Sequence, residues 1–220
     1  MPIYKKYNKN FFKTWSSDMA YILGFLFADG NIIKTKRGTH FTSIYTKDYQ
    51  LIRSIRFSIG SNHKIAKRVS ETGYCYNIQI GSKELFADLL ALGLIMNKAK
   101  RMELPHIPIE YAGDFIRGYF DGDGNVWVGF LNKKRKTPTH VIQSSFTSCS
   151  YDFLKSLLFC LKKQGLLGGY IYKVKAKNCS RLSFSTLDSL KLYKIMYNKL
   201  HKLYLPRKKL VFDKFIKMRP

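Results

Sequence analysis

Two aspartates, Asp29 and Asp123, stand at the ends of two similar segments and could together bind a metal ion. The segments, residues 22–30 and 116–124, are largely apolar, and each closes on Asp-Gly before an asparagine. A carboxylate at a helix C-terminus faces the negative end of the helix dipole, which costs roughly 0.3–1 kcal/mol. Two such carboxylates close together also repel each other. A hard cation such as Mg²⁺, which prefers oxygen ligands, would relieve both effects.

The charge of the chain indicates a polyanionic partner. Its 39 Lys and Arg against 14 Asp and Glu give a formal net charge of +25 in 220 residues. A hydrophobic fraction of 45% excludes a disordered polycation. No apolar run approaches the roughly 20 residues needed to span a bilayer, so we expect nucleic acid and no membrane. A dicarboxylate metal site beside a basic surface predicts hydrolysis of phosphodiester bonds, because the metal activates the attacking water.

The helices that must position the two aspartates carry small residues four positions apart. These residues are Gly24 and Ala28 in the first segment, and Gly118 and Gly122 in the second. Because no bulky side chain separates the backbones there, we expect the two motif helices to pack side by side with the aspartates at the same end. Ser16 or Ser17 is predicted to cap the first helix, and Pro108 to begin the second.

Each motif is followed by the same succession of patterns. A hairpin, an amphipathic helix (residues 48–59 and 151–164), a second hairpin and another helix are predicted in both copies. Ser82 and Thr186 are the expected caps of the last helices. Residues 1–105 and 106–220 are therefore predicted to be two copies of one unit, joined in a single chain.

Strand periodicity predicts which side chains face outward. In residues 170–177, Tyr170 and Tyr172 are expected on the buried face, and Lys173, Lys175 and Lys177 on the outer face. In the partner strand, Arg181 and Ser183 are expected to point outward. One face of each sheet would then pack on helices while the other offers cations and amides.

The four cysteines are predicted to be reduced. Cys75, Cys149, Cys160 and Cys179 form no CxxC pair and no cluster with histidine. Together with an N-terminus that has no secretion signal, they indicate an intracellular protein, in a prokaryotic cytoplasm or an organelle, that is not secreted.

At the two segments the sequence resembles the LAGLIDADG homing endonucleases, in the single-chain form with two motifs. The second segment keeps two acids, Asp121 and Asp123, whereas the first has Phe27 at the earlier acidic position. The resemblance covers about residues 15–215. It implies an α+β fold: a pseudo-twofold pair of αββαββα units whose motif helices meet and whose antiparallel sheets form a DNA-binding saddle.

The resemblance also implies the site and the reaction. Asp29 and Asp123 would bind divalent metal with the main-chain carbonyls of Ala28 and Gly122, and each site would cut one DNA strand, leaving short 3′ overhangs. Mg²⁺ is the expected cofactor, with Mn²⁺ able to substitute and Ca²⁺ supporting binding without cleavage. Lys98 and Lys208 are the best matches to the basic residue beside each site, although Lys100 and Lys209 stand close by.

The expected DNA contacts lie on the outward strand faces and in one basic loop. The strand residues are Lys64, Arg68, Asn77, Gln79, Gln143, Ser145, Lys173, Lys175, Lys177, Arg181 and Ser183. Thr35, Arg37 and Trp127 join them by family registration. Lys133, Lys134 and Arg135 are expected to hold phosphates in a loop inserted in the second copy.

The predicted function is site-specific cleavage of double-stranded DNA at a long target by a monomeric, intron-encoded enzyme. Two alternatives use the same fold. One is an RNA maturase that assists splicing of its own intron RNA, and the other is a DNA-binding relative that does not cleave. Retention of both Asp29 and Asp123 argues against the second alternative and only weakly against the first.

Overall fold

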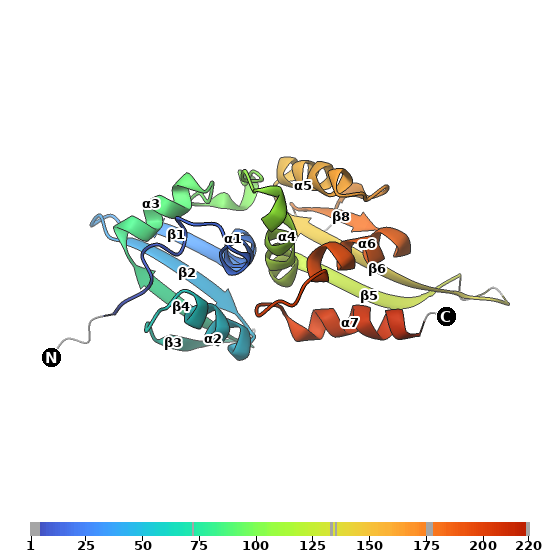
Figure 1. Cartoon of the computed structure of the whole chain (residues 1–220), viewed down its shortest axis with the longest axis horizontal. Helices are drawn as coiled ribbons and strands as arrows, with labels where there is room; N and C mark the ends of the chain where they lie inside the picture. The colour runs from blue at the N-terminus through green and yellow to red at the C-terminus, as the bar shows by residue number, and fades with distance from the viewer. Residues whose placement is uncertain (1–4, 72, 133, 135, 175–177, 219–220) are drawn as a thin grey trace. The chain divides into compact units, whose positions relative to one another are not determined.

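The computed structural model describes residues 5–71, 73–132, 134, 136–174 and 178–218. By its internal contacts the chain divides into two compact units (Figure 1). Unit 1 comprises Met1–Lys98 and Pro105–Gly122, and unit 2 comprises Ala99–Leu104 and Asp123–Pro220.

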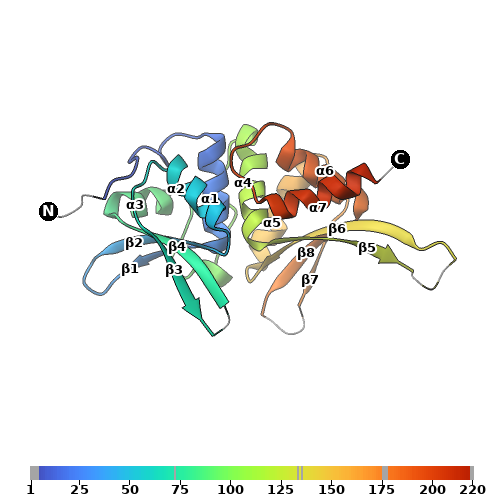
Figure 2. The same cartoon turned by 90° about the horizontal axis from the view of Figure 1, so that it is seen from below.

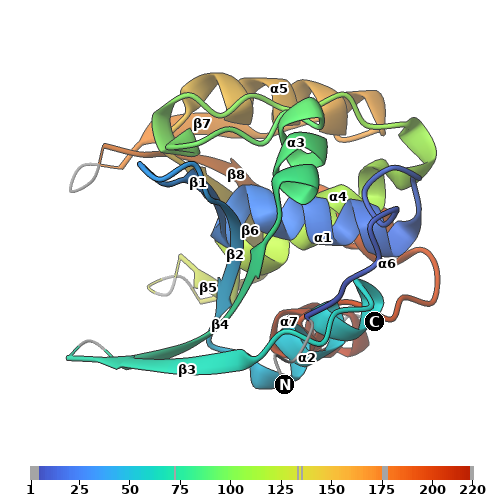
Figure 3. The ribbon, with the colours of Figure 1, turned by 90° about the vertical axis from the view of Figure 1, so that its left-hand side faces the viewer.

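The first half of the chain folds in the predicted αββαββα order. Its elements are α1 (Ser17–Asp29), β1 (Gly30–Lys34), β2 (His40–Thr46), α2 (Tyr49–Ser58), β3 (Ile65–Ser70), β4 (Gly73–Gly81) and α3 (Lys83–Ala91). All strand pairs are antiparallel, and the sheet order is β1-β2-β4-β3. The helices cover one face of this sheet and leave the other face open (Figure 2). The β3–β4 hairpin extends away from the helices of its unit (Figure 3).

The second half repeats this order and adds a helix. A short 3-10 turn, Lys98–Lys100, is followed by α4 (Ile109–Asp123), β5 (Gly124–Leu131), β6 (Thr139–Ser148), α5 (Tyr151–Lys163), β7 (Tyr170–Lys173), β8 (Ser180–Phe184), α6 (Thr186–Tyr197) and α7 (Pro206–Lys217). The sheet order, β5-β6-β8-β7, matches that of the first sheet, and α5, α6 and α7 lie on one face of it (Figure 2). The predicted α+β fold class is confirmed.

The helices begin within one residue of the positions that the sequence predicts. The Ser16 hydroxyl accepts a hydrogen bond from the Met19 amide at 3.2 Å, and α4 begins directly after Pro108. Ser82 likewise caps α3 through the Leu85 amide, at 3.1 Å. Thr186 is not the cap of α6 but its first residue, and its hydroxyl donates instead to the carbonyl of Ile142 at 3.1 Å.

Each sheet packs its large apolar residues toward its helices. In unit 1 the buried positions of the strands include Ile32, Ile44, Ile78 and Ile80. In unit 2 they include Ile142, Phe146, Leu182 and Phe184. The strands between these positions carry polar residues on the other face, as expected for antiparallel sheets with one solvated side.

The compact units do not coincide with the predicted repeats. Helix α4 opens the second repeat, but its residues as far as Gly122 belong to unit 1, where they contact α1. Because contact density measures packing and not duplication, the predicted repeat boundary after residue 105 stays a prediction.

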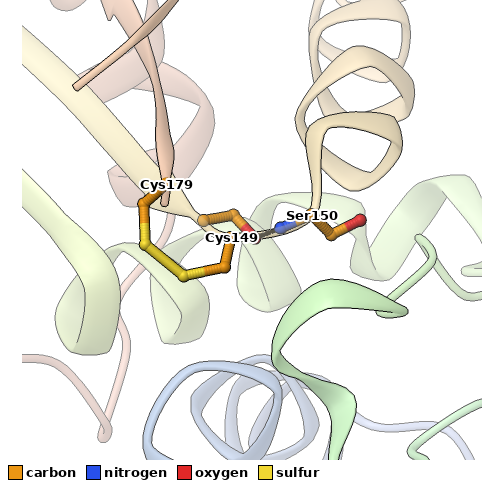
Figure 4. Close-up of a disulfide and its surroundings, with 4 residues drawn as sticks. Cys149, Ser150 and Cys179 are labelled. Atoms are coloured by element: carbon orange, nitrogen blue, oxygen red, sulfur yellow. Dashed lines mark hydrogen bonds between the residues drawn. A yellow bond between two sulfur atoms is a disulfide. The ribbon is translucent and has the colours of Figure 1, made fainter. Parts of the chain in front are cut away.

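The expectation of four reduced cysteines is wrong for two of them. Cys149 and Cys179 form a disulfide with a Cα–Cα distance of 3.9 Å (Figure 4). They are 30 residues apart in sequence, and the β6–β8 ladder brings them together: Ser148 pairs with Ser180, so Cys149 and Cys179 are the next pair. Cys75 and Cys160 are free thiols. The cysteine argument for an intracellular protein therefore no longer holds.

Candidate functional site

Helices α1 and α4 pack backbone against backbone at the small residues of the two motifs. A Cβ placed on Gly24 would lie 2.1 Å from the carbonyl oxygen of Phe115, and one on Gly118 would lie 2.0 Å from that of Tyr21. Both distances are far below van der Waals contact, so only glycine fits at either position. The close approach predicted from residues four apart is confirmed.

The approach continues to the C-terminal end of α1. A Cβ on Gly122 would lie 2.3 Å from the Ala28 side chain and 3.4 Å from Oδ2 of Asp29. Ala28, Asp29 and Gly122 are all half-buried, in contrast to the fully buried middle of each helix. The predicted metal ligands of unit 1 therefore lie where the helix pair reaches solvent.

Lys98 binds the C-terminal end of α1. Its Nζ donates hydrogen bonds to the main-chain oxygens of Leu26, Phe27 and Ala28 at 2.7, 2.5 and 2.7 Å. The Leu26 oxygen also accepts from the amide of Gly30, and the three carbonyls belong to the negative end of the helix dipole. A cation thus already lies on the Ala28 oxygen, beside Asp29. Lys98 makes this contact, whereas Lys100 is exposed, and the catalytic role of Lys98 stays a prediction.

Lys208 occupies the corresponding place in unit 2. This lysine is only 7% exposed, and its Nζ donates to the main-chain oxygen of Gly124 at 2.6 Å, one residue after Asp123. Its neighbour Lys209 instead bonds both carboxylate oxygens of Asp213, at 3.0 and 2.8 Å. That hydrogen bond raises the pKa of Lys209 and keeps its ammonium charged. Lys208, and not Lys209, is the lysine beside the predicted acid.

The two acids of the second motif have different surroundings. Asp121 is 3% exposed and accepts a hydrogen bond from the Tyr21 hydroxyl at 2.7 Å. Asp123 is half-buried and is the last residue of α4. Phe27, the counterpart of Asp121 in the first motif, is buried edge-on against Phe115 at 5.4 Å. The earlier motif position therefore contributes to packing in both copies.

The oxygen atoms available as metal ligands at the helix ends suit a hard divalent cation. They are carboxylate and carbonyl oxygens, the ligands that Mg²⁺ prefers, and the Ala28 oxygen already accepts from a cationic ammonium. Within the described ranges, no group of three or more His, Cys, Asp or Glu could hold a metal ion by itself. A site built on one acid and main-chain oxygens would depend on water and phosphate for its remaining ligands.

The open face of the unit 1 sheet centres on one ordered arginine. Arg68 stands opposite Cys75 in the β3–β4 ladder, donates from Nε to Oδ1 of Asn77 at 3.1 Å, and lies over the Tyr45 ring at 6.0 Å. Asn77 is on the predicted face but only 3% exposed. Because Asn77 holds Arg68 through its amide oxygen, it positions the arginine, and its own contact with DNA stays a prediction.

Other predicted contact residues of unit 1 lie along the same sheet. Gln79 is exposed and pairs with Ser43 on the open face. Lys64 is exposed directly before β3. Thr35 and Arg37 lie in the tight turn between β1 and β2, where the Thr35 amide donates to the Thr39 oxygen at 2.8 Å.

The open face of the unit 2 sheet forms a shallow cavity of about 470 Å³. Four predicted contact residues lie in register across it: Trp127 pairs with Gln143, and Ser145 pairs with Ser183. Arg181 also lines the cavity, and Ser145, only 7% exposed, lies at its floor.

The predicted face of β7 is wrong. Tyr170 pairs with Ser183 and Tyr172 with Arg181, so both tyrosines lie on the open face. Lys173 pairs with Ser180 and is on the opposite side from Arg181. The amphipathic ring of tyrosine suits a solvated surface as well as a core, and Ile171 is the inward residue here. Two tyrosines two positions apart in this strand are therefore a signal for an exposed aromatic face as well as for a buried one.

The remaining basic residues are placed only in part. Lys134 is exposed in the loop between β5 and β6. Lys133, Arg135, Lys175 and Lys177 lie outside the described residues. Across the parts of the chain that the structure describes, no helix is both long and apolar enough to cross a membrane.

Comparison with known proteins links this geometry to one family. Residues 110–195 match the sequence model of the LAGLIDADG-like domain. A curated relative, an uncharacterised protein of Methanocaldococcus jannaschii, is 28% identical over 116 residues. That match spans 50% of this chain and 40% of the relative, so the chain covers less than half of the relative's length.

Solved structures share the fold at low sequence identity. I-SmaMI bound to uncleavable DNA superposes with a TM-score of 0.66 at 14% identity, covering 93% of this chain and 88% of its own. I-SmaMI bound to uncleaved DNA with calcium gives 0.58 at 13% identity, covering 94% and 95%. I-DmoI in complex with DNA and Mn gives 0.57 at 17% identity, covering 84% and 98%.

Proposed function

We propose that this protein cleaves both strands of DNA at a long specific site. The match of residues 110–195 to the LAGLIDADG-like domain and the fold shared with single-chain LAGLIDADG homing endonucleases support the proposal. The observation that carries the proposal is the pair of motif helices, each ending in a half-buried aspartate. A lysine donates to a main-chain oxygen beside each of these acids. A protein that only binds DNA would not need an aspartate with a neighbouring lysine at the end of each motif helix.

Asp29 and Asp123, with the main-chain oxygens of Ala28 and Gly122, would hold the divalent metal. When bound, Mg²⁺ would activate the attacking water and stabilise charge on the leaving oxygen. Mn²⁺ is expected to substitute, and Ca²⁺ to support binding without cleavage. The complexes of I-DmoI with DNA and Mn, and of I-SmaMI with uncleaved DNA and calcium, support these expectations.

Lys98 and Lys208 would stabilise the negative charge that develops on the phosphate as it is attacked. Each is held by main-chain oxygens, Lys98 by three and Lys208 by that of Gly124, so each ammonium is fixed in place before substrate arrives. Electrostatic stabilisation is strongest when the charged donor needs no reorganisation during the reaction.

The open faces of the two sheets would contact the DNA target, with base edges read by side chains of the strands and phosphates held by lysines. The duplication of the unit in one chain supports a monomer composed of repeats 1–105 and 106–220. We further propose that cleavage leaves short 3′ overhangs and that the protein is intron-encoded. Because its substrate would be DNA, the protein would act inside the cell.

Cleavage selection from a randomised duplex library in Mg²⁺, followed by sequencing of the cut ends, tests the proposal. We expect one family of related sites cut on both strands. A protein that releases no discrete ends in Mg²⁺ or Mn²⁺ is not this enzyme. Binding to the selected site in Ca²⁺ should weaken with salt, with a log–log slope of about −0.9 per phosphate neutralised.

A further inference from the structure

We propose that the open face of the unit 2 sheet recognises A·T base pairs in the major groove, through contact with thymine methyl groups. The proposal rests on the proposed function and names the sequence that one half of the target must contain. The face is defined by five side chains, Trp127, Gln143, Tyr170, Tyr172 and Arg181, which line one cavity of about 470 Å³.

Trp127 lies flat along its strand. A Cβ on Gly129 would lie only 2.2 Å from the indole carbon Cζ2, so the ring fills the space above Gly129 and one of its faces is covered. The indole is still 42% exposed. It therefore presents a flat apolar surface toward a ligand above the sheet, and Gly129 is the residue that permits it.

Tyr170 and Tyr172 extend the apolar surface on the same open face, at the β7 edge of the sheet, whereas Trp127 lies at the β5 edge. Their ring centroids are 5.3 Å apart at an interplanar angle of 24°, and the residues are 64% and 38% exposed. Two rings stacked on each other leave no room for a base between them, because a base needs roughly its own stacking distance on both sides. Contact with the edge of a base pair fits this pair better than intercalation of a single base.

Gln143 supplies the complementary polar contact. It is exposed and stands directly opposite Trp127 in the β5–β6 ladder. In the major groove, a glutamine amide matches the N6 and N7 groups of adenine, while apolar side chains match the C5 methyl group of thymine. An amide beside an indole thus suits both halves of an A·T pair.

The cavity holds little charge for a surface of so basic a protein. Among the described residues that line it, Arg181 is the charged one, and the others are aromatic, hydroxyl, amide or glycine residues, with Ser145 at the floor. A face built only to hold phosphates would expose several lysines instead. The balance of rings and amides points to base edges.

Binding selection from a randomised duplex library in Ca²⁺, which needs no cleavage, is the first test. We expect one half of the selected site to be enriched in A·T pairs, and the Trp127→Ala variant to lose that enrichment in the same half only. Enrichment in G·C pairs there, or none, would overturn the inference. Absence of cleavage in Mg²⁺ alongside A·T selection would instead overturn only the proposed function.

Replacing thymine by uracil in that half is the second test, because it removes only the methyl groups. One buried methyl contributes about 0.8 kcal/mol, so affinity should fall about fourfold for each contacted thymine. Trp127→Ala should abolish the difference, whereas Trp127→Phe should keep part of it. Phe159→Ala, at a more exposed aromatic residue on α5 (62%), should leave the difference unchanged.

Single-stranded DNA and RNA probes of the same sequence complete the design. We expect duplex DNA to bind most tightly. Tighter binding of RNA or single strands that is lost in Trp127→Ala would show that the rings stack on unpaired bases, and it would overturn the inference.

Discussion

The open faces of the two sheets have the same strand order but different side chains. In unit 1, Arg68 is held by Asn77 and stacked over Tyr45, which fixes a guanidinium on the sheet. In unit 2, Trp127 and the stacked Tyr170 and Tyr172 present apolar rings beside amides. An ordered arginine suits guanine, and rings with a glutamine suit A·T pairs. Under the proposed function, the duplicated fold therefore presents two chemically different surfaces to DNA.

The helix ends differ less than the sheets do. Lys98 reaches the end of α1 from the 3-10 turn after α3, while Lys208 reaches Gly124 from the first turn of α7. The two lysines come from different elements and make the same kind of contact. The same contact beside each acid is therefore made from two different places in the chain.

The largest expected effect tests whether the two helix ends are equivalent. Asp29→Asn or Asp123→Asn should each slow double-strand cleavage about 10³-fold, because each loses the charge that holds the metal, worth several kcal/mol. Binding in Ca²⁺ should change little. Strand-resolved cleavage kinetics provide the measurement. Asp114→Asn, in the first half of α4 and paired with Arg117, is a control expected to affect stability but not the chemical step.

The second prediction concerns the disulfide between Cys149 and Cys179, both of which lie in unit 2. Cys149→Ser should lower the free energy of unfolding of unit 2 by about 3–4 kcal/mol, since the bond closes a loop across a separation of 30 residues. Cys160→Ser is the matched control in the same unit. If Cys149→Ser leaves the unfolding midpoint under oxidising conditions unchanged, the bond does not stabilise the unit.

The two tryptophans allow the units to be followed separately. Trp15, stacked on Tyr111 at 6.0 Å, belongs to unit 1, and Trp127 belongs to unit 2. Fluorescence of Trp15→Phe therefore reports on unit 2, and that of Trp127→Phe on unit 1. Denaturant unfolding of Cys149→Ser in both backgrounds should show the loss in the first only.

The third prediction concerns the close packing of α1 and α4 in unit 1. Gly24→Ala or Gly118→Ala should destabilise unit 1 by about 1–3 kcal/mol, because the new methyl group meets a backbone oxygen that cannot move without shifting a helix. Ser54→Ala on the exposed side of α2 is the control. Unchanged unfolding of Gly24→Ala, followed through Trp15, would contradict the packing.

The smallest effect is a pH dependence confined to unit 1. His63 is 5% exposed, and burial, reinforced by the nearby charge of Lys5, lowers its pKa below the ordinary value near 6.5. As pH falls below about 6.5, the unfolded state takes up the proton first, so stability decreases as pH approaches the lowered pKa of the folded state. Unfolding between pH 7.5 and 5 should show a decrease that His63→Gln removes and that His106→Gln, at an exposed site, retains.

Local patterns were sufficient to predict most of the fold. The paired motifs, the capping serines and the strand periods are signals carried by neighbouring residues, and they correctly predicted α1, α4 and the succession of elements after each. Lys98 and Lys208, chosen through the family resemblance, lie beside the helix ends, and their catalytic role stays a prediction.

The errors concern features that depend on register between strands. The face of Lys173 depends on which residue of β8 lies opposite, and Tyr170 and Tyr172 satisfy an apolar pattern on either side. Cys149 and Cys179 become neighbours only through the β6–β8 ladder. The burial of Asn77 depends on Arg68 reaching it from another strand. None of these contacts between strands can be read from the spacing of neighbouring residues in the sequence.

The most direct test of the central claim is strand-resolved mapping of the ends produced from the selected duplex in Mg²⁺. We predict one cut in each strand, displaced to leave a short 3′ overhang, with the double-strand break lost in Asp29→Asn and in Asp123→Asn. Intact duplex in Mg²⁺ and Mn²⁺, or unchanged cutting by both variants, would contradict the claim that the paired helix ends form the catalytic centre.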